Sequence, residues 1–221
     1  MKQKSLFRLL ALMLFACAIM AVVDGILQPG YIVKSAIKIV LFALLPLLFS
    51  RWDANLDVKS FLKPQKRGLL ISLALGVMLY GVILGAYFLI GPYFDFSAIA
   101  GSLTQNAGVT RDNFLYVSLY ISFINSFLEE FFFRGFLFSN LKGLLGRGNA
   151  YLFSALLFSF YHVAMMIGWF SPFLFVLVMV GLLVGGMIFN RLNESLDSIY
   201  ASWLTHMFAN FAINTIGFML L

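Results

Sequence analysis

Two neighbouring carboxylates and an arginine interrupt an otherwise aromatic segment of this sequence, Phe127–Gly135. The i,i+4 spacing of Glu130 and Arg134 predicts an ion pair along one helix face, whereas Glu129 is rotated from Glu130 by about 100°. We therefore expect Glu130 and Arg134 to form a structural pair, with Glu129 left free to face a cavity. The alternative is that the whole cluster lies at an interface and only ends a helix.

The two histidines of the chain lie in two further apolar runs. His162 follows Phe158 by four residues, and His206 precedes Asn210 by four, so that each pair shares one helix face. A carboxylate, two imidazoles and a carboxamide can activate water and stabilise an oxyanion, which are the groups that amide hydrolysis needs. Glu129, His162 and His206 could instead hold zinc with an open position for water. No HExxH motif is present, which excludes a zincin-type site.

The composition says where such a site must lie. The 221 residues are 62% hydrophobic, 17% aromatic and 11% charged, with a mean hydropathy of +0.97. A soluble domain carries about 25% charged residues, so this chain cannot cover a water-soluble surface. A soluble enzyme, a disordered chain and a nucleic-acid-binding domain are therefore excluded, and the lipid bilayer is the expected environment. The net charge of +6 needs no nucleic acid, because cytoplasmic loops of membrane proteins collect Lys and Arg.

The lengths of the apolar runs predict an all-α, polytopic transmembrane bundle that forms one integral-membrane domain over residues 1–221. A spanning helix needs about 20 apolar residues, whereas strands of a membrane barrel are about half as long and alternate. The first run is expected to be an uncleaved span, since no small-x-small cleavage site follows it. About seven runs qualify: Leu6–Val23, Tyr31–Ser50, Gly68–Ile90, Phe114–Phe138, Ala150–Trp169, Pro172–Phe189 and Ile199–Leu221.

The loop charges predict the orientation. Basic residues gather before the first span, in residues 51–67, at Lys142 and Arg147, and at Arg191, while the opposite loops hold Arg111. This asymmetry favours a cytoplasmic N-terminus. Residues 190–197 are expected to form a boundary between two spans.

Two smaller predictions concern the span surfaces. Lys34 and Lys38, near the outer end of the second span, are expected to snorkel to the interface. The glycine pairs Gly81/Gly85 and Gly181/Gly185 are expected to make close helix contacts within the bundle.

The depth of the polar residues supports a common site. At 1.5 Å per residue, Glu129 lies roughly 20 Å from the outer end of its span, and His162 roughly 18 Å from the cytoplasmic start of its own. His206 and Asn210 lie roughly 10–17 Å from the cytoplasmic start of the last span. Three helices can thus bring the four side chains into one slab of the membrane.

These residues, in this order, resemble the CPBP intramembrane proteases, also called the Abi family, which include CAAX proteases, bacteriocin-processing enzymes and Rce1-type CAAX prenyl endopeptidases. The motif EExxxR corresponds to Glu129, Glu130 and Arg134, followed by Gly135. The motif FxxxH corresponds to Phe158 and His162, and HxxxN to His206 and Asn210. Each motif is short, but together they cover residues 123–214, the expected catalytic core.

The resemblance implies an intramembrane endopeptidase. Glu129 would be the general base that activates water, with His162 assisting it. His206 and Asn210 would polarise the scissile carbonyl and stabilise the oxyanion, and Glu130 and Arg134 would hold their helix in place. The family motifs fit a metal-independent mechanism without an obligatory cofactor; the alternative is a divalent metal such as zinc on Glu129, His162 and His206.

The expected partner is a membrane-associated protein or peptide, lipidated or leader-bearing, in the bacterial cytoplasmic membrane. Two other functions stay open. One is a non-catalytic scaffold, bacteriocin-immunity or regulatory protein with the same fold. The other is an ion pathway, since intramembrane Glu and His also mark such pathways, although no repeated halves are evident.

Overall fold

The computed structural model describes residues 2–99, 101 and 109–220, and within these ranges the regular structure is entirely helical. The α-helices are α1 (Lys2–Val22), α2 (Tyr31–Ile39), α3 (Leu45–Trp52), α4 (Lys66–Ile90), α6 (Phe114–Tyr120), α7 (Ser126–Glu129), α8 (Ser139–Leu145), α9 (Arg147–Tyr161), α10 (Val163–Met166), α11 (Pro172–Leu196) and α12 (Ile199–Leu220). The π-helices are η1 (Val23–Leu27), η2 (Val40–Leu44), η4 (Ile121–Asn125) and η5 (Glu130–Phe138), and η3 (Gly91–Tyr93) is a 3₁₀ turn.

Five helical segments in the described part of the chain are long and apolar enough to cross a membrane, judged by length and composition: Lys2–Leu27, Tyr31–Trp52, Gly68–Tyr93, Arg147–Met166 and Pro172–Leu196. They correspond to five of the seven predicted spans. The other two predicted spans are also helical, but they carry the carboxylates, histidine and asparagines of the candidate site. Those polar side chains make both helices less apolar than the rest, and the count of seven stays a prediction.

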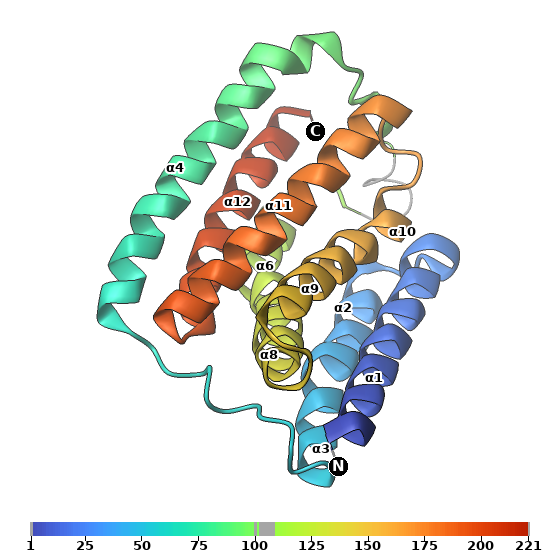
Figure 1. Cartoon of the computed structure of the whole chain (residues 1–221). Coiled ribbons are helices and arrows are strands. Elements are labelled where there is room, and N and C mark those ends of the chain that lie inside the picture. The colour runs from blue at the N-terminus through green and yellow to red at the C-terminus, as the bar shows by residue number, and fades with distance from the viewer. Residues whose placement is uncertain (1, 100, 102–108, 221) are drawn as a thin grey trace.

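The helices form a bundle in which the C-terminal half lies between two N-terminal parts (Figure 1). Helices α1 to α3, drawn in blue, lie on one side and contact η5, α8, α9 and α10. Helix α4, drawn in teal to green, lies on the other side and packs along α12. Helix α12 also contacts α7, η4 and α11, so the helix that bears His206 is surrounded by other helices.

An aromatic core fixes the segment that carries the two carboxylates. The ring of Phe42, on η2, stacks on that of Phe132 with centroids 4.0 Å apart and an interplanar angle of 4°. Phe133 meets both Phe42 and Phe158 edge-on. These buried rings hold η5 against η2 and α9, and the carboxylates directly before them are therefore held in place.

The π-helices next to the site leave backbone carbonyls that side chains from elsewhere can use. A π-helix replaces i→i−4 bonds by wider turns and is frequent at functional sites. In η4, the carbonyl of Ile121 accepts a bond from Asn210 Nδ2 at 3.1 Å, and that of Phe123 accepts one from Trp203 Nε1 at 3.0 Å. Helix α12 is thus joined to η4 by polar contacts.

The expected boundary between the last two spans lies at the end of the range 190–197, because α11 continues to Leu196 and α12 begins at Ile199. Within this last part of α11, Glu194 joins the helix to α9 by accepting bonds from Arg147 Nε at 2.9 Å and Tyr151 Oη at 2.7 Å. The helix ends at Asp197, whose φ of 46° is left-handed.

The predicted glycine contacts within the bundle are wrong. A methyl group added at any of the four glycines Gly81, Gly85, Gly181 and Gly185 would meet no atom within 4 Å. The close approach of α4 to α12 occurs instead at Gly76, where such a carbon would lie 2.6 Å from Cδ2 of Phe208.

Candidate active site

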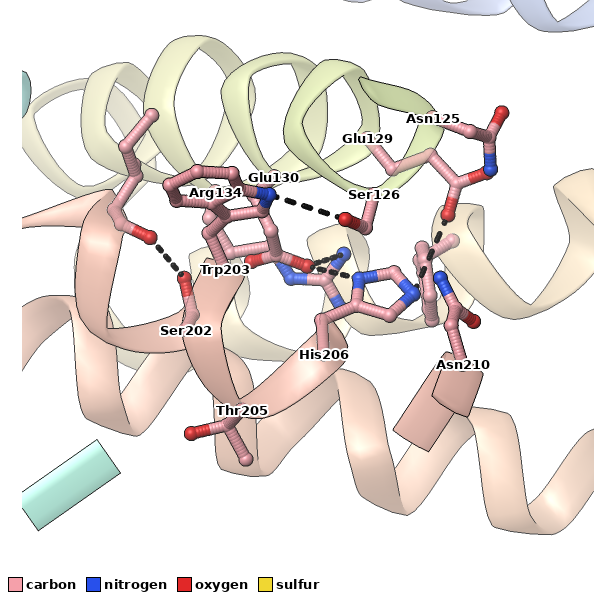
Figure 2. A network of polar contacts seen from close by, with 12 residues as sticks. Asn125, Ser126, Glu129, Glu130, Arg134, Ser202, Trp203, Thr205, His206 and Asn210 are labelled. Atoms are coloured by element: carbon pink, nitrogen blue, oxygen red, sulfur yellow. Dashed lines mark hydrogen bonds and ion pairs between the residues drawn. The ribbon is translucent and has the colours of Figure 1, made fainter. Parts of the chain in front are cut away.

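The residues of the three motifs meet inside the bundle, and Figure 2 shows those of the first and third motifs. Glu129 ends α7, Glu130 begins η5, His162 lies between α9 and α10, and His206 and Asn210 lie on α12. None of these five side chains belongs to a residue more than 9% exposed. The residues that the sequence predicted to meet therefore lie together, on helices that are far apart in the chain.

The two carboxylate oxygens of Glu129 have different neighbours. Oε1 accepts hydrogen bonds from Lys38 Nζ at 2.5 Å and from Asn125 Nδ2 at 3.0 Å. Oε2 faces the Nε2 atoms of His162, at 3.9 Å, and His206, at 3.7 Å. These two distances exceed a direct hydrogen bond, and a water to one side of the three atoms would be within reach of all of them. One oxygen is held, and the other faces two imidazoles.

Glu129 is consequently not free, which corrects the sequence prediction. Its partner Lys38 does not snorkel to the interface: the residue is 3% exposed, and its ammonium forms an ion pair with the carboxylate. Lys34, one helical turn earlier, pairs with Asp24 at 2.5 Å instead. A lysine near the end of an apolar run resembles a snorkelling residue, and nothing local in the sequence separates the two.

Glu130 joins His206 to Arg134. Its Oε1 lies 3.3 Å from Arg134 Nη1, as the i,i+4 spacing predicts, and 2.9 Å from His206 Nδ1. Because a carboxylate accepts hydrogen bonds, Nδ1 of His206 carries a proton and Nε2 is the nitrogen directed to Glu129. The sequence did not predict that His206 lies between both carboxylates.

Phe158 positions two other motif residues. The Arg134 guanidinium lies 3.9 Å above its ring, a cation–π contact in a site that is fully buried. The backbone carbonyl of Phe158 lies 2.8 Å from Nδ1 of His162. Since a carbonyl oxygen only accepts, Nδ1 of His162 is protonated, and in the neutral ring Nε2 is left as an acceptor.

The asparagines of α12 form a polar row toward η4 and α6. Asn210 bonds to the carbonyl of Ile121, and Asn214 donates to the Ser118 carbonyl at 3.1 Å and to Ser122 Oγ at 3.0 Å. Asn214 was missed, although it follows Asn210 at the same four-residue spacing. The second N–H of the Asn210 amide is not used by the bond to Ile121.

Residues 111–212 match the family described as type II CAAX prenyl endopeptidase Rce1-like. The chain contains an Rce1-like segment. The predicted resemblance is confirmed, and all motif residues from Glu129 to Asn210 lie within the match. No curated protein and no solved structure matches the chain. With the apolar helices, the match indicates an integral membrane protein, and the family that residues 111–212 match is a protease family.

The Rce1-like segment does not contain the whole site. Lys38 comes from α2 and lies well before the matched residues, yet it contacts the carboxylate of Glu129 as closely as any group inside the segment. The N-terminal helices therefore contribute to the site as well as to the membrane-embedded surface.

The residues of the Rce1-like segment do not fit a resident metal. Among the described residues, no group of three or more His, Cys, Asp and Glu side chains is arranged to hold one. The proposed ligands Glu129, His162 and His206 would also share the site with the Lys38 ammonium, 2.5 Å from the carboxylate, whose charge opposes a divalent cation.

Proposed function

We propose that this chain is an intramembrane endopeptidase that hydrolyses a peptide bond of a membrane-associated protein through water activated by Glu129. The observation that carries the proposal is the placement of Glu129 Oε2, which faces Nε2 of both histidines in a buried site. The Rce1-like match also supports it, because residues 111–212 match a family of endopeptidases.

In the proposed reaction, Oε2 of Glu129 takes a proton from water while the water oxygen bonds to the scissile carbonyl carbon. His162 Nε2, an acceptor in the neutral ring, holds the other water proton. The carbonyl electron pair moves to its oxygen, and this oxyanion receives the free N–H of Asn210 and, when His206 Nε2 is protonated, the imidazole N–H. The carbon–nitrogen bond then breaks, and the leaving amine takes the proton from Glu129.

Glu130 and Arg134 act through other groups in this proposal. Glu130 fixes the ring of His206 through Nδ1, as carboxylates fix histidines in other hydrolases. Arg134 balances the charge of Glu130. The reaction uses no metal, and metal analysis of the purified protein, with cleavage measured after chelation, tests this part separately.

We further propose seven spans with the N-terminus on the cytoplasmic side of a bacterial membrane. The loop charges support this orientation. The start of α1 and the end of α12 lie at opposite ends of the bundle, as an odd number of crossings requires (Figure 1). The proposed substrates are membrane proteins with a leader peptide or a lipidated terminus, presented within the bilayer.

The test is a comparison of membrane peptides from cells that produce the native protein and cells that produce Glu129→Gln. We expect at least one membrane protein to remain uncut in the Glu129→Gln cells. Identical peptides in both cells, with both proteins folded and inserted, would instead support the non-catalytic scaffold.

A further inference from the structure

Lys38 is a buried cation in a place where charge is costly. Its ammonium lies within the bundle, 5.0 Å from the Tyr161 ring and 5.2 Å from the Phe42 ring. It donates to Asn125 Oδ1 and to Glu129 Oε1, each at 2.5 Å. Ionisable residues inside membrane helices are rare and usually serve a function, so the position calls for a physical account.

Three hydrogen bonds join the side chains of Lys38, Asn125 and Glu129 into a closed triangle. Lys38 donates to the carbonyl oxygen of Asn125, which leaves the Asn125 amide nitrogen directed at Glu129 Oε1. Oε1 therefore receives two donors from two different helices, and rotation of the carboxylate would break both bonds. With Oε1 held, Oε2 is directed at His162 and His206.

We propose that Lys38 is a positioning residue for this reaction: with Asn125, it fixes Glu129 so that Oε2 faces the imidazoles, and it keeps the carboxylate in the basic form. This inference rests on the proposed function, in which Glu129 is the base. It assigns to α2, outside the Rce1-like segment, a direct part in the chemistry.

A purely structural role is the competing explanation, and Lys34 provides the comparison. Lys34 is also on α2 and also forms an ion pair, with Asp24, but it does not contact Glu129. If ion pairs on α2 serve only to hold the helix in place, removing either lysine should affect the protein in the same way. If Lys38 positions the base, only Lys38 should change the rate of the chemical step.

The experiment measures kcat and KM in liposomes, on the membrane protein identified by the peptide comparison, for Lys38→Met, Lys38→Arg and the control Lys34→Met. We expect Lys38→Met to lower kcat by about 10²-fold with little change in KM, because a misplaced catalytic group costs that much. Lys38→Arg should recover most of kcat, and Lys34→Met should retain it. A folded Lys38→Met protein with native kcat would overturn the proposal.

If the Lys38→Met protein does not fold, a second variant and a second measurement still test the proposal. Asn125→Leu removes one donor to Oε1 and leaves the lysine, and it should lower kcat about tenfold; native kcat in this variant would contradict the triangle. Infrared difference spectra against Glu129→Gln should show a carboxylate band in the native protein and in Lys38→Arg. A protonated carboxyl band in the native protein would also contradict the assignment.

The outcomes separate the two proposals. If Glu129→Gln cleaves at the native rate, the proposed function itself fails. If Glu129→Gln is inactive while Lys38→Met and Asn125→Leu keep native kcat, the function stands and only the role of Lys38 fails.

Discussion

The two N-terminal parts of the bundle differ in what they give to the Rce1-like segment between them. Helix α4 packs on α12, and its hydrogen bonds there, in the described part of the chain, are made with Thr205 and Thr215, which are not motif residues. Helix α2 places Lys38 against Glu129, the central carboxylate. Both come from the part of the chain before the match, and both are apolar enough to span a membrane. The matched segment thus contains the motif residues but leaves out Lys38, which contacts one of them.

The difference has a physical origin. On α4, apolar residues face outward along most of its length, as lipid contact requires, and helix packing needs only shape. The charge of Lys38 on α2 is tolerated because the carboxylate of Glu129 on α7 compensates it, and Lys38 in turn compensates the charge of Glu129. A substitution on α4 should therefore change only the packing and stability of the bundle, whereas a substitution of Lys38 on α2 should also change the site.

The largest effect is expected from Glu129→Gln. Removing the proposed base should lower the cleavage rate about 10²–10⁴-fold while the protein stays folded. The matched control is Glu194→Gln, the same change of carboxylate to amide in a surface cluster, which should keep the rate. Cleavage by the purified proteins in liposomes measures both, and equal rates would remove Glu129 from the mechanism.

The next effect is on stability. Glu130→Gln leaves the fully buried Arg134 without its counter-charge, and breaking such a pair costs about 3–5 kcal/mol. Glu194→Gln, whose basic partners are 41–63% exposed, should cost only about 0–1 kcal/mol. Thermal unfolding in detergent compares the two variants, and similar losses would mean that Glu130 and Arg134 do not support the site as proposed.

A somewhat smaller effect is expected from Asn210→Ala. Loss of one donor to the oxyanion should reduce kcat by about 10²–10³-fold. Asn214→Ala, one turn further along α12 and bonded to Ser118 and Ser122, serves as the control for lost helix contacts. If both variants reduce kcat equally, Asn210 acts only by joining α12 to η4.

The smallest effect is expected from glycine substitutions on α4, which test where this helix packs on α12. Gly76→Ala places a methyl group against Phe208, and such overpacking costs about 1–3 kcal/mol. Gly81→Ala on the same helix meets no neighbour and should be neutral or stabilising, because alanine favours helix over glycine. Unfolding measurements on both variants test whether α4 packs where the structure places it; an equal response would contradict it.

The sequence predicted the helical class and the residues that meet in the site, because a charged or polar residue in an apolar run is conspicuous. It also predicted the Glu130–Arg134 pair, since four-residue spacing places two side chains on one face. Lys38 and the contact of His206 with Glu130 could not be predicted, because both join elements far apart in the chain.

The sequence predicted the helix boundaries better than the contacts between helices. The predicted boundary at residues 190–197 contains the end of α11, but that Glu194 in this range binds Arg147 and Tyr151 on α9 could not be predicted. The glycine pairs look like packing motifs, yet spacing alone does not tell whether a partner helix lies opposite.

The most direct test of the central claim is single-turnover cleavage in heavy-oxygen water, followed by mass spectrometry of the product and of the peptide that contains Glu129. If Glu129 activates water, the new carboxyl terminus of the product carries one heavy oxygen and Glu129 carries none. Heavy oxygen in the Glu129 carboxylate would show that this residue attacks the carbonyl itself and would contradict the account.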